Sequence, residues 1–130
     1  MFRKMRRFKQ QLEEEECREV LRQQKRGVLS LTGDDGRPYG VPLNHWYCPE
    51  DGKLYFHGGT IGHRIDAMRR DPRTSFCVLD GGTPEDSDWS LWFRSVIVFG
   101  RLEIVEDHGR AMELTRQLSL HFTDDVNYID

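Results

Sequence analysis

The sequence lacks any long hydrophobic run. Nothing in its 130 residues approaches the roughly 18 consecutive apolar residues that a membrane-spanning helix needs, so no membrane span is expected. The basic residues near the start are not followed by an apolar segment, which argues against a secretory signal peptide; they are Arg3, Lys4, Arg6, Arg7 and Lys9. We therefore expect a cytoplasmic protein that does not act at a membrane.

Cysteine is scarce. Cys17, Cys48 and Cys77 form an odd, widely spaced set without a C-x-x-C pair, which argues against a disulfide framework and against a zinc ribbon. A tetrahedral ligand set can be drawn on paper from His45, Cys48, His57 and His63. Because His45 and Cys48 flank a strand end rather than a tight knuckle, we expect no metal site.

A basic excess is also missing. Nineteen Lys and Arg residues stand against 22 Asp and Glu residues, for a net charge of −3, whereas proteins that bind nucleic acid usually carry a positive excess. We expect no nucleic-acid partner, although an RNA-binding adaptor that uses the basic arm of residues 1–10 is a rival interpretation. The length fits a single domain over residues 1–130, of which residues 1–10 form that arm.

The first half of the chain predicts a helix followed by three short strands. Apolar residues at helical spacing predict a helix over residues 12–24, and Gly27 is expected to stop it. Alternating residues at 28–32, 38–47 and 53–57, separated by turns at 33–36 and 49–52, predict an antiparallel meander.

The second half predicts a helix at 63–71, a strand at 74–79, a polar loop at 80–88 and a helix at 107–122. Between the last two lies a long apolar segment, 89–106, whose alternation changes phase, so we expect one strand bent at Gly100. Bent strands of this kind are typical of small barrels. We expect a mainly β fold, a small barrel with peripheral helices, in which Ile97 and Phe99 fill the barrel while Val96 and Val98 face outward onto a second copy of the chain.

A glycine-rich segment, "FHGGTIGHR" at residues 56–64, has the parts of a phosphate site. Its bare backbone amides can converge, Thr60 offers a hydroxyl, a helix begins near His63, and Arg64 supplies a guanidinium. It matches neither a Walker A loop nor the dinucleotide-binding motif. A plain glycine-rich turn fits the spacing equally well, and both interpretations stay open on the residues alone.

Pro42 lies inside a strand pattern, where it cannot donate a hydrogen bond to a neighbouring strand. Gly40, Pro42 and Asn44 share one face of that strand, and a flat aromatic cofactor could lie against these small residues. The alternative is an ordinary edge strand on which the proline blocks aggregation.

Four segments together resemble the flavin-binding split-barrel family of pyridoxamine 5′-phosphate oxidase, in its nitroimidazole-resistance branch. They are "PYGVPLN", "YFHG", "GHRID" and "SVIVFGR", and the likeness runs from about Met5 to the end of the sequence. The resemblance implies a split β-barrel of the FMN-binding type and a homodimer with the flavin at the subunit interface. In relatives a further barrel strand follows the helix of residues 107–122, so the resemblance also predicts an open barrel edge here.

The resemblance also implies which residues bind the cofactor. The isoalloxazine ring would be bordered by Val41, Pro42, Leu43 and Asn44, and from the other side by Ser95 and Val96. The ribityl-phosphate side would be formed by His57, Gly58, Thr60, Gly62, His63 and Arg64. His57 is either a hydrogen-bonding anchor for that loop or, in a catalytic role, a proton donor to the reduced substrate.

The implied activity is that of an oxidoreductase. It would use FMN, with FAD as an alternative, to pass electrons from a nicotinamide donor to a small acceptor such as a nitroaromatic. A non-catalytic flavin or haem carrier or sensor on the same barrel is the competing interpretation.

Overall fold

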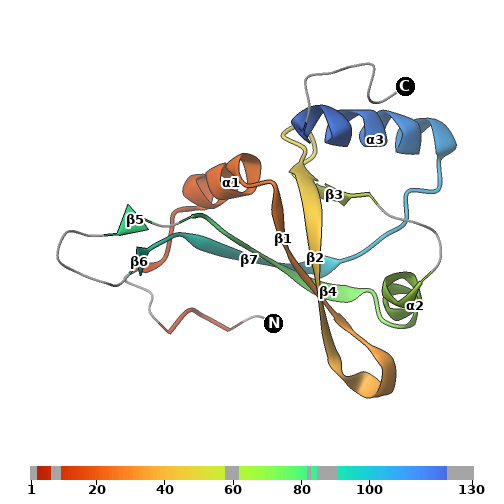
Figure 1. The fold of residues 1–130 in the computed structure, drawn as a ribbon, viewed down its shortest axis with the longest axis horizontal. Coiled ribbons are helices and arrows are strands. Elements are labelled where there is room, and N and C mark those ends of the chain that lie inside the picture. Colours follow the sequence, from red (N-terminus) through yellow and green to blue (C-terminus); the bar gives the residue numbers. More distant parts are fainter. Residues whose placement is uncertain (1–2, 7–9, 58–61, 82, 85–90, 123–130) are drawn as a thin grey trace.

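The chain folds around one curled antiparallel sheet. The computed structural model describes residues 3–6, 10–57, 62–81, 83–84 and 91–122. Within them, five strands pair in the order β3-β2-β1-β4-β7, and helices α1, α2 and α3 lie around the sheet (Figure 1). The expected mainly β architecture is confirmed, in the form of a half-barrel.

Helix α1, Glu14–Gln23, precedes the sheet and buries Val20 and Leu21. It ends at Gln24, whose N–H donates to the Val20 carbonyl, and the expectation that Gly27 stops the helix was wrong. Gly27 belongs to strand β1, Arg26–Thr32, where a Cβ atom would lie 2.5 Å from the Cys77 carbonyl oxygen. Glycine is therefore needed at position 27 for close approach between strands.

Strands β1 and β2, Pro38–Tyr47, form the expected hairpin, with Val28 opposite Pro42 and Ser30 opposite Gly40. A 3-10 turn, Asp34–Gly36, joins them, and both Asp35 and Gly36 have positive φ. Strand β3, Leu54–Phe56, is shorter than expected and pairs with the end of β2. The predicted meander is confirmed.

Helix α2, His63–Arg70, and strand β4, Arg73–Leu79, follow as predicted. Beyond them, Thr83–Pro84 (β5) pairs with Leu91–Trp92 (β6), so the segment expected as a loop contains a short strand. Strand β7, Ser95–Arg101, pairs with β4. The long segment is thus not one strand bent at Gly100: it is interrupted at Phe93 and Arg94, and β7 ends at Arg101.

The predicted facing of β7 was also wrong. Val96 is only 8% exposed, whereas Ile97 and Phe99 are 57% and 55% exposed. Directly paired residues of neighbouring strands share a face, and Val96 pairs with the fully buried Val78. The partner strand therefore decides which side of β7 is buried.

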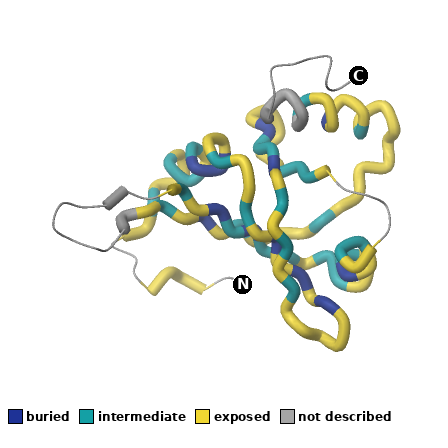
Figure 2. The backbone as a smooth tube through the Cα atoms, viewed as in Figure 1, coloured by how far each residue is buried: buried dark blue, intermediate teal, exposed yellow. Residues whose placement is uncertain are grey.

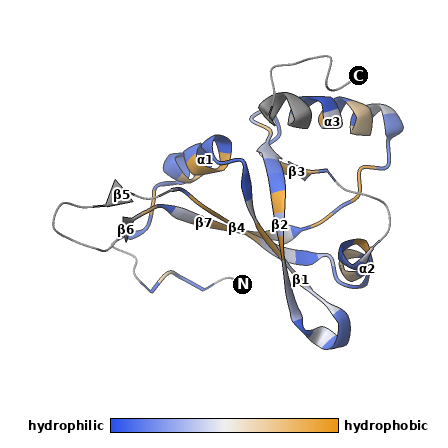
Figure 3. Ribbon diagram, viewed as in Figure 1, coloured by the Kyte–Doolittle hydropathy of each residue, from blue (hydrophilic) through white to orange (hydrophobic). Residues whose placement is uncertain are grey.

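The core lies between the inner face of the sheet and helices α1 and α2. Its buried hydrophobic residues are Val20, Leu21, Leu29, Leu31, Ala67, Phe76, Val78 and Val96. Figure 2 shows buried positions along α1, α2 and the central strands, and Figure 3 shows hydrophobic residues in the same elements. His45 is fully buried among them, and its Nε2–H donates to the Leu21 carbonyl at 2.9 Å, which joins β2 to α1.

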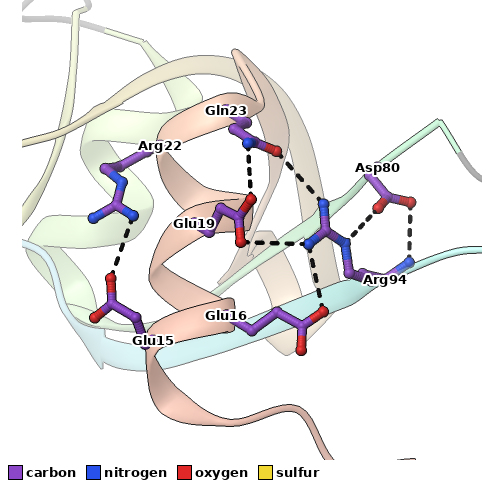
Figure 4. A network of polar contacts seen from close by, with 7 residues as sticks. All are labelled: Glu15, Glu16, Glu19, Arg22, Gln23, Asp80 and Arg94. Atoms are coloured by element: carbon purple, nitrogen blue, oxygen red, sulfur yellow. Dashed lines mark hydrogen bonds and ion pairs between the residues drawn. The ribbon is translucent and has the colours of Figure 1, made fainter.

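A network of polar side chains joins α1 to the start of β7 (Figure 4). The Arg94 guanidinium donates through Nε to Asp80 Oδ2 at 2.9 Å, and the backbone N–H of Arg94 donates to Asp80 Oδ1 at 3.0 Å. The same guanidinium lies 3.4 Å from a Glu16 oxygen and 3.7 Å from a Glu19 oxygen. These contacts fix the break between β6 and β7.

Helix α3, His108–Phe122, agrees with the predicted helix and packs against β2 and β3. The Asp107 carboxylate accepts a hydrogen bond from the Arg110 N–H at 2.9 Å, which satisfies one of the free amides at the helix start. In the part of the chain that the structure describes, no helix has the length and apolar character needed to cross a membrane.

Candidate functional site

The start of α2 presents free backbone donors. Gly62 has a φ of 130° and caps the helix without a side-chain hydrogen bond to it. The first helical hydrogen bond is made by Asp66, whose N–H donates to the Gly62 carbonyl at 3.0 Å. Because the N–H groups before Asp66 have no helical acceptor and lie at the positive end of the helix dipole, an anion would be favoured there. The candidate residues Gly58 and Thr60 lie outside the described residues.

His63 fixes this helix start against the β1–β2 hairpin. Its ring stacks on Tyr39 with the centroids 4.1 Å apart, and its Nε2 lies 3.8 Å from an Asp34 oxygen. At the other end of the same helix, Arg70 Nη2 lies 3.0 Å from Asp34 Oδ1. The helix start is therefore held beside Tyr39, which immediately precedes Gly40 on β2.

The sheet divides the predicted ring-binding residues between two faces. Pro42, Asn44 and Ser95 are exposed on the outer face, which we define as the side of the sheet away from α1 and α2. Val41, Leu43 and Val96 alternate onto the inner face, where Leu43 packs against the core and Val96 is part of it. A ligand on the outer face could touch the side chains of the first group but only the backbone of the second.

The outer face carries small and apolar residues in two rows that cross the strands. One row is Pro42, Val28, Cys77 and Ile97, and the next is Gly40, Ser30, Ser75 and Phe99. A Cβ atom on Gly40 would lie 3.3 Å from a Val28 methyl group. The absence of a side chain at Gly40 thus leaves the sheet flat beside Pro42, as contact with a planar ring would require.

The inner side of the half-barrel encloses a cavity of about 700 Å³. Its walls include Leu43, Phe76, Val98 and Leu114, and the candidate residues His57 and Arg64 line it as well. The face of α2 that borders the cavity consists of Arg64, Ile65, Met68 and Arg69. Arg64 and His57 therefore lie at the cavity, whereas Pro42, Asn44 and Ser95 lie across the sheet from it.

Two features of this region were not predicted. Arg69 falls on the cavity face of α2 because it follows Ile65 by four residues, and helical periodicity could have found it. The second is a polar cluster at the cavity edge, where the Tyr55 hydroxyl donates to Asp51 and Arg110 lies 3.7 Å from Asp51 Oδ2. Burial and the hydrogen bond to Asp51 raise the pKa of Tyr55 above its usual range. Burial opposes ionisation of Asp51, but hydrogen bonds from Tyr55 and from the Lys53 N–H lower the pKa of that carboxyl.

The structure separates the residues considered for zinc. His45 is in the core, with Nε2 on the Leu21 carbonyl, whereas His63 stacks on Tyr39 at the hairpin. Across residues 3–6, 10–57, 62–81, 83–84 and 91–122, no group of three or more His, Cys, Asp or Glu side chains is arranged to hold a metal ion.

A family model described as pyridoxamine 5′-phosphate oxidase matches residues 13–128. The match spans nearly the whole sequence, so the chain belongs to this family, and the fold is its split barrel. The family expected from the sequence motifs is confirmed. None of the curated proteins is significantly similar to the chain.

Three solved structures illustrate the likeness, and each alignment covers 87% of this chain. A conserved hypothetical protein from Mycobacterium tuberculosis is 26% identical, with a TM-score of 0.72 and 66% of its own length covered. A candidate 5-nitroimidazole antibiotic resistance protein from Bacteroides thetaiotaomicron is 24% identical, with a TM-score of 0.72 and 68% covered. An FAD-binding protein from Mesorhizobium loti is 31% identical, with a TM-score of 0.66 and 77% covered.

Proposed function

We propose that this chain is a flavoprotein that binds FMN, with the phosphate at the start of α2. The observation that carries the proposal is the uncapped helix start at Gly62, which is held beside β2 by the stacking of His63 on Tyr39. Backbone N–H groups, a positive helix end and the Arg64 guanidinium form a donor set that suits a phosphate dianion. FMN rather than FAD fits this arrangement best, because a terminal phosphate can meet these donors directly.

The ring would lie along the outer face of the sheet. Pro42, Asn44 and Ser95 would contact it through their side chains, since all three are exposed there. Val41, Leu43 and Val96 would contribute backbone atoms, because their side chains belong to the inner face. Gly58 and Thr60 complete the proposed phosphate loop, as the motif resemblance implies.

We further propose an oxidoreductase that takes electrons from a nicotinamide donor and passes them to a small acceptor such as a nitroaromatic. A bound flavin supplies the redox chemistry. The protein binds and orients the reactants and limits the access of water. His57 follows β3 and lines the cavity, where it would anchor the phosphate loop or hold a proton for the acceptor.

A second copy of the chain would complete the site. The outer face exposes Val28, Leu79, Ile97 and Phe99, and an apolar surface of this kind is typical of an interface between proteins. A homodimer formed through this face would cover the ring. The dimer expected from the sequence is therefore retained, with Ile97 and Phe99 in place of Val96 and Val98 at the interface.

Arg64→Ala tests the phosphate position. Loss of a charge-assisted contact should weaken FMN binding about tenfold to a hundredfold, while riboflavin, which has no phosphate, should bind almost as before. Titration of both ligands into flavin-free protein measures the difference. Arg70→Ala is the matched control, since it removes the same charge from the opposite end of α2 and should leave both affinities nearly unchanged. Equal losses of FMN and riboflavin in Arg64→Ala would contradict the proposed phosphate site.

A non-catalytic carrier of flavin or haem is the second candidate. The observation that favours haem is the largely apolar cavity with His57 on its wall, because an imidazole is a common axial ligand of haem iron. The absorption spectrum of the purified protein separates flavin, haem and the absence of a chromophore. Colourless protein that takes up no FMN would rule out the flavin proposal.

A further inference from the structure

The cavity inside the half-barrel has the composition of a ligand site. It measures about 700 Å³, which is within the range of roughly 300 to 1,000 Å³ that small-molecule sites occupy. Its walls are hydrophobic and come from distant parts of the chain, among them Phe56 from β3, Met68 from α2, Val98 from β7 and Leu114 from α3. A site of this size and composition favours a ligand with an apolar body.

The charged residues that line the cavity are mostly cations. Lys53, Arg64, Arg69 and Arg101 line it, and Glu103 is the one carboxylate among the described lining residues. This balance is opposite in sign to the net charge of −3 of the whole sequence. The cavity therefore attracts an anion although the protein as a whole is acidic.

Arg69 carries an uncompensated charge at this site. Over the described ranges, neither Arg64 nor Arg69 forms an ion pair, whereas the adjacent Arg70 pairs with Asp34 at 3.0 Å and Arg73 pairs with Asp71 at 2.8 Å. Ile65 and Met68, which border the same cavity, separate Arg64 from Arg69 along α2. Arg69 thus combines an available guanidinium with an adjoining apolar wall.

From this combination we propose that the cavity binds an amphipathic carboxylate, with its hydrocarbon chain inside the half-barrel and its carboxylate on Arg69. A guanidinium and a carboxylate form paired hydrogen bonds, and a hydrocarbon chain gains free energy with each methylene removed from water. This site goes beyond the proposed flavin function. The flavin ring is assigned to the outer face, and the hydrocarbon chain lies across the sheet from it.

Calorimetric titration of the full chain with octanoate, decanoate and dodecanoate, each below its micelle concentration, tests the proposal. Affinity should rise by up to about fourfold for each added methylene, as burial of a CH₂ group predicts. Decanol, which has the same chain without the charge, should bind at least tenfold more weakly than decanoate. Binding should be present in flavin-free and in FMN-loaded protein, so failure of the flavin proposal leaves this test intact.

Two variants locate the ligand. Arg69→Ala should weaken decanoate about tenfold or more while leaving decanol unchanged, and Arg70→Ala, the matched control, should weaken neither. Ala111→Phe should shrink the cavity and weaken dodecanoate more than octanoate. The proposal is overturned if dodecanoate does not bind to wild type, as it would not if the chain itself or a second copy fills the cavity. Equal affinity for decanoate and decanol, or loss of decanoate when FMN is loaded, would overturn it as well.

Discussion

Gly27 shows how one residue can control the spacing of two strands. A Cβ atom at position 27 would lie 2.5 Å from the Cys77 carbonyl oxygen and 2.7 Å from Phe76 Cζ, so both the backbone and a core side chain would have to move. Overpacking of this kind costs about 1 to 3 kcal/mol, and we expect Gly27→Ala to destabilise the fold by that amount. Urea unfolding followed by circular dichroism measures the change.

Gly100→Ala is the matched control for that experiment. Gly100 also lies in a strand of the sheet, but a Cβ atom there meets nothing within 4 Å in the described chain. Its stability should change little or rise by about 0.4 to 1 kcal/mol, because alanine reduces the freedom of the unfolded chain. Equal effects of the two substitutions would show that close approach to β4 is not the reason for glycine at position 27.

The same two glycines show what local sequence can and cannot predict. Gly27 follows a helical pattern and was interpreted as a helix stop, but its role depends on Cys77, far along the chain. Gly100 coincides with a change of alternation and was interpreted as a bend, whereas the strand simply ends after it. A glycine indicates that a side chain is unwelcome, and only the tertiary structure shows what occupies the space.

At the scale of elements, Arg94 joins the start of β7 to α1. Its guanidinium is 30% exposed and reaches Asp80, Glu16 and Glu19, whereas Arg22 pairs only with the exposed Glu15 among the described carboxylates. Exposed ion pairs contribute little to stability, but a partly buried carboxylate such as Asp80 loses a charged donor when its arginine is removed. We expect Arg94→Ala to lower the urea midpoint measurably and Arg22→Ala to leave it nearly unchanged.

Hydrogen exchange gives an independent measurement of this connection. In Arg94→Ala the amides of α1 and of the first residues of β7 should exchange faster, while those of the β1–β2 hairpin should keep their protection. If exchange rises equally throughout the sheet, or if Arg22→Ala destabilises as much as Arg94→Ala, the network in Figure 4 does not have the proposed role.

Elements whose pattern is local could be predicted from the sequence. The helices over residues 63–71 and 107–122 and the hairpin of β1 and β2 follow from apolar spacing and turn residues. The facing of β7 could not be predicted, because Arg94 interrupts the segment through contacts with Asp80 and α1. The prediction continued the alternation across that interruption and so assigned Ile97 and Phe99 to the wrong side of the sheet.

The candidate site follows the same division. The helix start at His63 and the exposed small residues Pro42 and Asn44 were predicted from glycine placement and strand alternation. That Arg64 and His57 line a cavity on the opposite side of the sheet depends on how β3, α2 and α3 pack together. Motif residues close together in the sequence can thus lie on different surfaces.

At the scale of the whole molecule, the exposed outer face predicts self-association. Wild-type protein should sediment as a dimer at micromolar concentration, and Ile97→Glu should shift it toward monomer, because a buried and unpaired charge at the centre of an interface is unfavourable. Met112→Glu is the control: Met112 is also exposed, at 61%, but lies on α3. A monomeric wild type, or a dimer that tolerates Ile97→Glu, would contradict the proposed interface.

The strand order has a consequence for how the chain acquires its fold. β1, β2 and β3 are neighbours in both sequence and space, so they can pair as soon as they are synthesised. The other edge of β1 must wait for β4, since Val28 pairs with Cys77. Pairing between distant segments forms slowly, and an unpaired strand edge can associate with other chains in the meantime. The nascent protein therefore passes through a stage in which its most central strand is open on one side.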